Sequence, residues 1–259
     1  MDNRPIGIFD SGVGGLSVWR ELVDQLPNES VLYYADSLNC PYGNKPLSEI
    51  KELSENIVKF LLEQEAKLII VACNTATAAA IDYLRDHYPI PFVGMEPAIK
   101  PAAINTRTGS IAILATEGTF NGRLFNETKS KYAKNIDVSI IVGEGLVEIV
   151  EENKIHKENS KQTINQLLKP VITKDIDHLV LGCTHYPFLI KQFTDVVGEN
   201  VKIVNPAPAV VKQTKRILDE FNLNANLSNL PQYNFWSSGD KKILNSLLSE
   251  ITDHNYSVL

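Results

Sequence analysis

The 259-residue sequence predicts an α/β protein made of two similar α/β domains, each with a mainly parallel sheet. Three observations lead to this fold class. Strand and helix patterns alternate along the chain, a buried strand that ends at a cysteine occurs twice, and a second strand end recurs at nearly the same spacing. Two such domains related by a pseudo-twofold axis would bring the two cysteines face to face across one cleft.

The repeated cysteine strand is the strongest pattern. Residues 68–77 begin with an apolar run rich in β-branched residues, reach Cys73 and continue into an alanine-rich helix former. Residues 178–187 repeat the apolar run, a small residue and a cysteine, here Cys183. Each cysteine is therefore predicted at the carboxyl end of a strand and before a helix N-terminus, where open α/β sheets bind their ligands. The second repeat is a strand and the turn after it, because residues 6–12 resemble residues 111–118.

Short apolar runs and amphipathic stripes predict the strands and helices of the first half of the chain. The long helix has apolar residues at 50, 53, 57 and 60/61, one face of a helix. Asn74 and Thr75 are short polar residues typical of helix N-caps. The expected elements are strands at 5–9 and 31–35 and before Cys73, with helices at 16–26, at 48–66 and from Cys73 to about 87.

The second half repeats this alternation. Its expected elements are strands at 111–115, 138–142, 201–204 and before Cys183, with helices at 120–132, 144–152 and around 161–172. A C-terminal segment follows, with a helix at 209–221, a strand at 233–236 and a helix at 241–251 that are expected to pack back onto the first unit.

Prolines mark two predicted crossings between the units. Pro89, Pro91 and Pro97 interrupt the pattern around residues 92–95, and residues 205–208 form the return. The predicted domains are therefore 1–97 plus 208–259, and 98–207.

Composition excludes several classes of protein. With 44% hydrophobic and 22% charged residues the chain is an ordinary globular protein. The net charge of -6 and the lack of a basic stretch argue against nucleic acid as a primary partner. The N-terminus lacks a signal-peptide core, and the longest nearly apolar stretch is too short to span a bilayer. We therefore expect no membrane partner. Three cysteines make no disulfide framework, so we expect a cytoplasmic protein with reduced thiols.

Two loops have competing interpretations. The glycine-rich turn that starts at Asp10 resembles a dinucleotide fingerprint, but Ser17 replaces the third glycine and an acidic residue opens the turn. It is better interpreted as a turn that presents Asp10 and Ser11 to a cleft. The loop that contains Tyr42 and Gly43 is either a simple turn or a place where backbone amides hold an anionic group.

The cysteines also allow two interpretations. A single free cysteine is most often a small buried hydrophobe, but two at matching strand ends favour acid/base chemistry, because a helix N-terminus stabilises a thiolate. A zinc site from Cys40, Cys73, Cys183 and His185 lacks a Cys-x-x-Cys pair, so no metal is predicted. Glu148, polar within an apolar helical stretch, is more often a solvated residue. The other four histidines, His87, His156, His178 and His254, are expected to be ordinary surface or packing residues.

Motifs along nearly the whole chain resemble the cofactor-independent aspartate/glutamate racemase superfamily, and within it the glutamate racemases. The matching motifs are residues 9–16, 41–43, 72–75, 96–98, 115–119 and 182–187, in family-like order and spacing. The resemblance implies two α/β domains with the active site between them.

The resemblance also implies site residues. Cys73 and Cys183 would be the two acid/base groups, with Asp10 assisting Cys73 and with His185 and Glu148 assisting Cys183. The implied substrate-binding residues are Asp10, Ser11, Tyr42, Gly43, Asn74, Thr75, Thr116, Thr119, Thr184 and His185. No cofactor is implied.

The implied activity is interconversion of L- and D-glutamate, which supplies D-glutamate for bacterial peptidoglycan, by a protein that is expected to be a homodimer. Two alternatives stay open: an aspartate racemase, and a non-catalytic amino-acid-binding regulator on the same scaffold. The regulator should have lost one thiol, and both are present.

Overall fold

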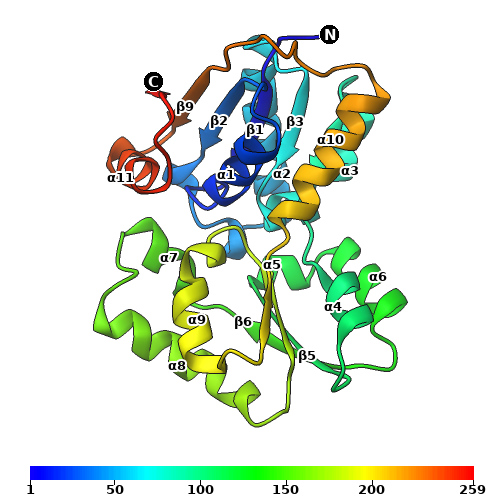
Figure 1. Cartoon of the computed structure of the whole chain (residues 1–259), viewed down its shortest axis with the longest axis vertical. Coiled ribbons are helices and arrows are strands. Elements are labelled where there is room, and N and C mark those ends of the chain that lie inside the picture. Colours follow the sequence, from blue (N-terminus) through cyan, green and yellow to red (C-terminus); the bar gives the residue numbers. More distant parts are fainter.

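The computed structural model describes all 259 residues and has two parallel sheets, one in each of two lobes (Figure 1). The first lobe contains the chain termini and a six-stranded sheet. Its strands are β1 (Ile6–Asp10), β2 (Val31–Ala35), β3 (Leu68–Val71), β4 (Phe92–Gly94), β9 (Tyr233–Ser237) and β10 (Ser257–Val258). Its helices are α1 (Leu16–Gln25), α2 (Leu47–Glu63), α3 (Asn74–His87), α10 (Ala207–Glu220) and α11 (Lys241–Ile251).

The second lobe has a four-stranded sheet. Its strands are β5 (Ser110–Ala115), β6 (Asp137–Val142), β7 (His178–Gly182) and β8 (Lys202–Val204). Its helices are α4 (Ile99–Asn105), α5 (Glu117–Phe120), α6 (Arg123–Tyr132), α7 (Leu146–Glu151), α8 (Glu158–Ile172) and α9 (Ile190–Val197). The predicted α/β class with two mainly parallel sheets is confirmed. We keep the predicted domain boundaries, 1–97 plus 208–259 and 98–207, as a proposal.

The two sheets have the same topology. The first has the order β10-β9-β2-β1-β3-β4 and the second β6-β5-β7-β8, so the core order β2-β1-β3-β4 recurs. Phe9 pairs with Val71 in the first sheet, and Leu114 pairs with Leu181 in the second. Both partners lie two positions before a cysteine, which is the arrangement that an internal duplication predicts.

This register corrects one equivalence that the sequence suggests. If Gly12 is aligned with Gly118, Asp10 corresponds to Thr116. The strand pairing instead makes Phe9 equivalent to Leu114, so Asp10 corresponds to Ala115 and Ser11 to Thr116. Hydrogen bonds between strands fix the register, whereas the turn that follows each strand can differ in length. The carboxylate of Asp10 therefore has no counterpart in the second lobe.

Several elements differ from the prediction. Residues 92–95, predicted as part of a crossing, include edge strand β4, which pairs with β3 directly after Pro91. The helix predicted at 120–132 is α6, which begins at Arg123, and the short helix α5 that precedes it was not predicted. Helix α4 and strand β10 were not predicted. The C-terminal segment does return to the first sheet, where β9 pairs with β2.

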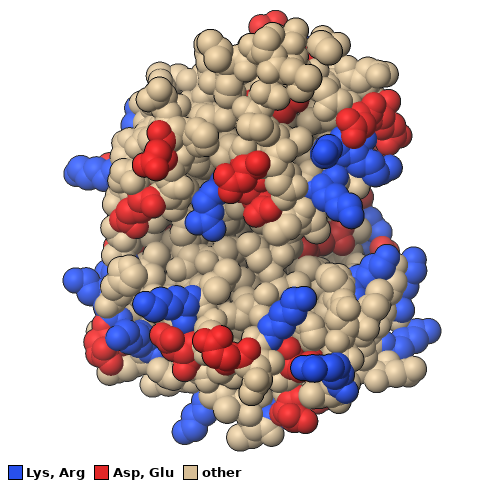
Figure 2. Space-filling model, viewed as in Figure 1, with Lys and Arg blue, Asp and Glu red and all other residues tan.

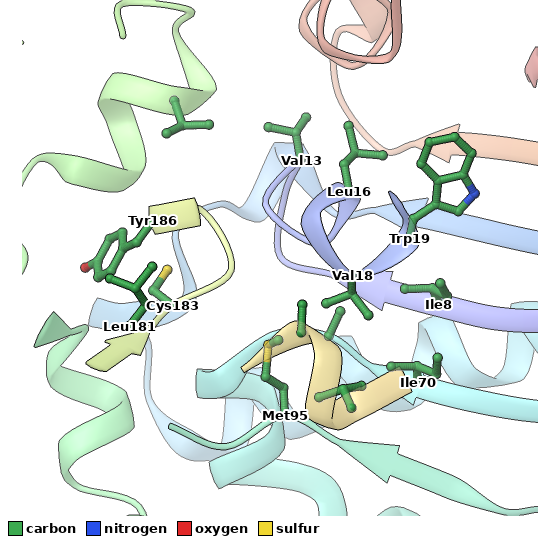
Figure 3. Packing of buried hydrophobic residues seen from close by; sticks show 14 of the residues in the cluster. Ile8, Val13, Leu16, Val18, Trp19, Ile70, Met95, Leu181, Cys183 and Tyr186 are labelled. Carbon is green, nitrogen blue, oxygen red and sulfur yellow. The ribbon is translucent and has the colours of Figure 1, made fainter. Parts of the chain in front are cut away.

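One hydrophobic core joins the lobes. A cluster of 44 buried residues includes strand residues of both sheets. Figure 3 shows Leu181, Cys183 and Tyr186 of the second lobe beside Val13 and Met95 of the first. The lobes are thus held together by packing as well as by the backbone crossings.

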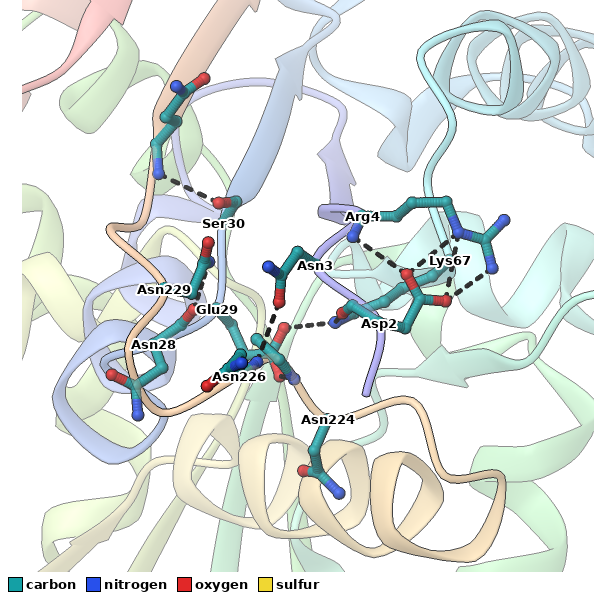
Figure 4. Close-up of polar contacts among 12 residues, drawn as sticks. Asp2, Asn3, Arg4, Asn28, Glu29, Ser30, Lys67, Asn224, Asn226 and Asn229 are labelled. Atoms are coloured by element: carbon teal, nitrogen blue, oxygen red, sulfur yellow. Dashed lines mark hydrogen bonds and ion pairs between the residues drawn. The ribbon is translucent and has the colours of Figure 1, made fainter.

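A buried ion pair anchors the returning chain at the end of the first sheet where β1 and β3 begin. Lys67 Nζ lies 2.6 Å from Glu29 Oε2, and both side chains are almost fully buried. Lys67 also donates to the Asp2 carbonyl at 2.5 Å, and the Ala225 amide donates to Glu29 Oε1 at 2.8 Å. Figure 4 shows this cluster together with Asn229, whose amide donates to the Asn28 carbonyl. These contacts fix the segment that leads from α10 into β9.

The surface seen in Figure 2 has basic and acidic side chains interspersed over both lobes. None of the helices is both long and apolar enough to cross a bilayer.

Candidate active site

Cys73 lies where β3 meets α3. It is itself the N-cap of α3, and its Sγ accepts a hydrogen bond from the Ala76 amide at 3.4 Å. Sγ also donates to Ser11 Oγ at 3.6 Å. The prediction that Asn74 or Thr75 caps this helix is therefore wrong, because the sulfur occupies the capping position and those residues form the first turn. The helix N-terminus favours negative charge on the sulfur.

Asp10 is a fully buried carboxylate at the end of β1. Its Oδ1 accepts from the Ser11 amide at 2.7 Å, and its Oδ2 accepts from Thr184 Oγ1 of the second lobe at 2.8 Å. Burial raises the pKa of Asp10 above its ordinary value. Burial, with the charge of Asp10, also raises the pKa of Cys73 to about 12. At neutral pH these surroundings keep the proton on Cys73.

Cys183 has different neighbours. It follows the last residue of β7 and precedes a 3-10 helix, Tyr186–Leu189, so it does not cap an α-helix as Cys73 does. Its Sγ lies 3.6 Å from Nδ1 of His185. On the other side of the ring, His185 Nε2 lies 2.6 Å from Oε1 of Glu151. Cys183, His185 and Glu151 thus form a chain of contacts.

The carboxylate of this chain differs from the one that the resemblance suggested. Glu148 makes no hydrogen bond to His185, whereas Glu151, one turn later on α7, does. Both residues lie in a helical stretch with acidic residues three apart, so the sequence does not distinguish them. Only the docking of α7 against the loop after β7 selects Glu151. Glu148 lies nearby and lines the cleft described below.

His185 and Glu151 stabilise each other's charged forms. Burial would lower the pKa of His185, but its hydrogen-bond partners, Cys183 first among them, raise it well above the ordinary value. Burial would raise the pKa of Glu151, but the hydrogen bond from His185 outweighs it, and the pKa lies below the ordinary value. A buried imidazolium therefore faces the Cys183 sulfur.

The glycine-rich turn after β1 allows the two lobes to approach each other closely. A Cβ at Gly14 would lie 2.4 Å from His185 Nδ1, and one at Gly12 would lie within 2.7 Å of the Glu151 carboxyl carbon. The Val13 amide donates to Glu151 Oε1 at 2.7 Å. This amide, which a dinucleotide site would direct at a phosphate, is thus bonded to a carboxylate of the protein itself.

Three threonine hydroxyls meet where the lobes join. Thr75 Oγ1 lies 2.8 Å from Thr116 Oγ1, which lies 2.9 Å from Thr119 Oγ1. Asn74, beside them in sequence, is buried, and its Oδ1 has no hydrogen-bond partner. These hydroxyls can donate to a carboxylate, and the free amide oxygen can accept from an ammonium group.

The loop after β2 is fixed by Asp36, which in the sequence is the acidic residue that the weak dinucleotide fingerprint would need after the second strand. Tyr42 donates to Asp36 Oδ2 at 2.6 Å, and Ser238 donates to Oδ1 at 2.7 Å. This arrangement holds the loop so that Gly43 lines the cleft and packs near Thr116.

A cleft of about 190 Å³ opens between the lobes above these groups. It is lined by Pro41, Gly43, Asn44, Thr116, Glu117, Val142, Gly143, Glu144, Gly145, Val147 and Glu148. Neither cysteine lines it, and both are buried, Cys73 at 5% exposed and Cys183 at 7%. The remaining predicted residues, Ser11, Tyr42, Asn74, Thr75, Thr119, Thr184 and His185, are also buried.

A different set of donors from that considered in the sequence could hold a metal ion. Cys40 Sγ, a carboxylate oxygen of Glu151 and a ring nitrogen of His185 lie within 4.8 Å of one another. His178 is a packing residue, as predicted, because it is buried at the start of β7 and its Nδ1 lies 2.7 Å from Asp177 Oδ1.

Comparisons with known proteins agree with this geometry. Residues 6–214 match the family model described as Asp/Glu/Hydantoin racemase. The chain is 47% identical over 218 residues to a glutamate racemase of Herpetosiphon aurantiacus, covering 84% of this chain and 86% of the relative.

Solved structures are similar over their full length. The glutamate racemase isoform RacE1 of Bacillus anthracis has a TM-score of 0.90 and 31% identity, covering 100% of this chain and 97% of that one. The Escherichia coli glutamate racemase in complex with L-glutamate and the activator UDP-MurNAc-ala has a TM-score of 0.86 and 30% identity, covering 99% and 98%.

Proposed function

Because the chain belongs to the Asp/Glu/Hydantoin racemase family, we propose that it is a cofactor-independent racemase that interconverts L-glutamate and D-glutamate. The observation that carries this proposal is the pair of buried thiols at corresponding strand ends of a repeated unit. The names of the relatives support glutamate as the substrate.

The reaction needs one acid and one base on opposite faces of the α-carbon. In each turnover the thiolate of one cysteine takes the α-proton, and the thiol of the other gives its proton to the opposite face. The enzyme ends with the thiolate on the second sulfur, so charge is conserved and the substrate leaves inverted. The reverse reaction uses the same groups in exchanged roles.

The surroundings of the thiols favour one resting state. The Asp10 carboxylate lies near Cys73, and the His185 imidazolium faces Cys183. These surroundings favour the proton on Cys73 and put a positive charge beside Cys183. Glu151 positions His185 for this role.

The binding groups suit a dicarboxylic amino acid. We propose that the hydroxyls of Thr75, Thr116 and Thr119 donate to a substrate carboxylate and that Asn74 accepts from the α-ammonium group. Ser11, Tyr42, Gly43, Thr184 and the amides of their turns complete the binding set. None of these steps requires a cofactor.

The deciding experiment is incubation of dialysed protein with L-glutamate in deuterated water, with no cofactor added. We expect loss of the α-proton signal and formation of D-glutamate carrying α-deuterium. L-aspartate in a parallel sample distinguishes an aspartate racemase. No exchange with either amino acid, in protein with reduced thiols, would favour the non-catalytic binding protein.

We further propose that the D-glutamate supplies peptidoglycan synthesis. The activator bound by the Escherichia coli relative contains a MurNAc unit, which is a component of peptidoglycan, and this supports the link for that protein. The homodimer and the cytoplasmic location stay predictions.

A further inference from the structure

Cys40 is a thiol that racemisation does not use, and it lies beside groups that racemisation does use. It belongs to the loop between β2 and α2 and is partly exposed. Its Sγ, a Glu151 carboxylate oxygen and a His185 ring nitrogen all lie within 4.8 Å of one another. A thiol, an imidazole and a carboxylate at this separation are a donor set that suits Zn²⁺.

A second cavity gives two of these donors access to solvent. Its volume is about 270 Å³, and Cys40 and Glu151 are both in its wall. Three more carboxylates, those of Glu148, Glu152 and Asp240, line it, and no lysine or arginine does. Such a lining concentrates cations. Pro41, Val147 and Glu148 also line the substrate cleft, so they lie between the two spaces.

We propose that Cys40, Glu151 and His185 form an inhibitory site for a borderline-soft divalent cation of the Zn²⁺ class. Three protein ligands leave the fourth tetrahedral position for water from the acidic cavity. Binding displaces the thiol proton of Cys40 and the Nε2 proton of His185 to solvent, and no electron is transferred.

The ligands need only a small rearrangement. Two ligand atoms bound at about 2.0 Å in a tetrahedral site lie roughly 3.3 Å apart. Glu151 Oε1 and His185 Nε2 now lie 2.6 Å apart, so they must separate by several tenths of an ångström. Glu151 is in the wall of the cavity, and its Oε1 would give up the hydrogen bond from the Val13 amide to make this move.

Occupancy would stop racemisation, a consequence that rests on the proposed function. The cation replaces the Nε2 proton and binds the Glu151 carboxylate that stabilises the imidazolium form of His185. His185 can then no longer present that charge to Cys183. The Cys40 loop and α7 thereby make activity sensitive to the free cation concentration.

The test begins with chelator-treated full-length protein titrated with Co²⁺, a spectroscopic substitute for Zn²⁺. We expect one Co²⁺ per chain, a thiolate-to-cobalt charge-transfer band in the near ultraviolet, and loss of that band when Zn²⁺ is added. Cys40→Ser should abolish the band and weaken Zn²⁺ binding at least about tenfold. Cys73→Ala, a matched removal of another thiol, should keep the band.

Activity gives a second readout. Zn²⁺ at low free concentration should inhibit the wild-type racemisation of glutamate, while Cys40→Ser should stay active and become resistant. No charge-transfer band in the wild type, or a band that survives Cys40→Ser and disappears in Cys73→Ala, would overturn the site. Equal Zn²⁺ inhibition of Cys40→Ser would overturn its inhibitory role. Apoprotein inactive on glutamate would contradict the proposed function instead, and the cobalt spectrum would still decide whether the metal site exists.

Discussion

The two cysteines occupy equivalent positions in a repeated unit but have opposite electrostatic surroundings. Cys73 follows β3, caps α3 and lies near the buried Asp10 carboxylate. Cys183 follows β7, caps no α-helix and faces the imidazolium of His185. Two positions after each cysteine, the first lobe has Thr75 and the second has His185.

The difference shows how a duplicated scaffold can supply an acid and a base at once. The repeated strand order fixes where the sulfurs lie, and the residues that differ between the repeats fix where the charge lies. The halves are also linked directly, because Thr184 of the second lobe donates to Asp10 of the first and Val13 of the first donates to Glu151 of the second. The surroundings of each thiol thus depend on both lobes.

The largest expected effect comes from removing either thiol. Cys73→Ala and Cys183→Ala should each lower racemisation by at least about 10³-fold while leaving the fold intact, because each removes a required proton-transfer group. Chiral analysis measures the loss, and circular dichroism checks the fold. Each variant should still exchange the α-proton of one enantiomer with solvent deuterium, and the favoured enantiomer should differ between them. Full activity in either variant would contradict the two-thiol mechanism.

A smaller loss, about 10²-fold in kcat/KM, is expected for Glu151→Gln. Glu151 helps to raise the pKa of His185, so without its charge that pKa falls toward the ordinary value. The imidazolium is then lost at lower pH, and the alkaline limb of the pH–kcat/KM profile should move to lower pH. Glu148→Gln is the control and should leave the limb where it is. A shifted limb in Glu148→Gln and an unshifted limb in Glu151→Gln would show that Glu148, and not Glu151, assists at Cys183.

For Asp10→Asn we expect roughly a tenfold loss of kcat/KM and a change at Cys73. The charge of Asp10 contributes to the raised pKa of Cys73, so that pKa should fall below about 12. Ultraviolet absorbance of the thiolate, followed in a background where Cys40 and Cys183 are alanine, measures it. An unchanged pKa would mean that burial alone raises the pKa of the Cys73 thiol above its ordinary value.

The last comparison concerns alkaline stability. The pKa of Cys73 is about 12 in the folded protein and about 8.5 when unfolded, so the folded state binds more protons between these values. The stabilisation from the protonated thiol is complete below about pH 8.5 and is lost toward about pH 12, at up to about 1.4 kcal/mol per pH unit. Urea unfolding of Cys73→Ala should show a shallower alkaline decline than the wild type. Ser17→Ala, a non-titrating change at the same lobe boundary, should decline as the wild type does.

The fold could be predicted because its signals are local. β-branched runs, amphipathic stripes and the repeated cysteine strand indicate strands, helices and a duplication without any knowledge of contacts. Edge strand β4 and the four-residue helix α5 were missed because three-residue strands and short helices have little periodicity to detect.

The sequence by itself determined that two thiols end equivalent strands, because strand periodicity and a repeat are properties of the chain. Only the tertiary structure decided that Glu151 rather than Glu148 contacts His185, that Asp10 matches Ala115, and that Cys40 lies beside the histidine. Those relations depend on how α7 and the loop after β2 dock across the cleft. Docking is set by packing and hydrogen bonds between segments more than a hundred residues apart, and no local pattern encodes it.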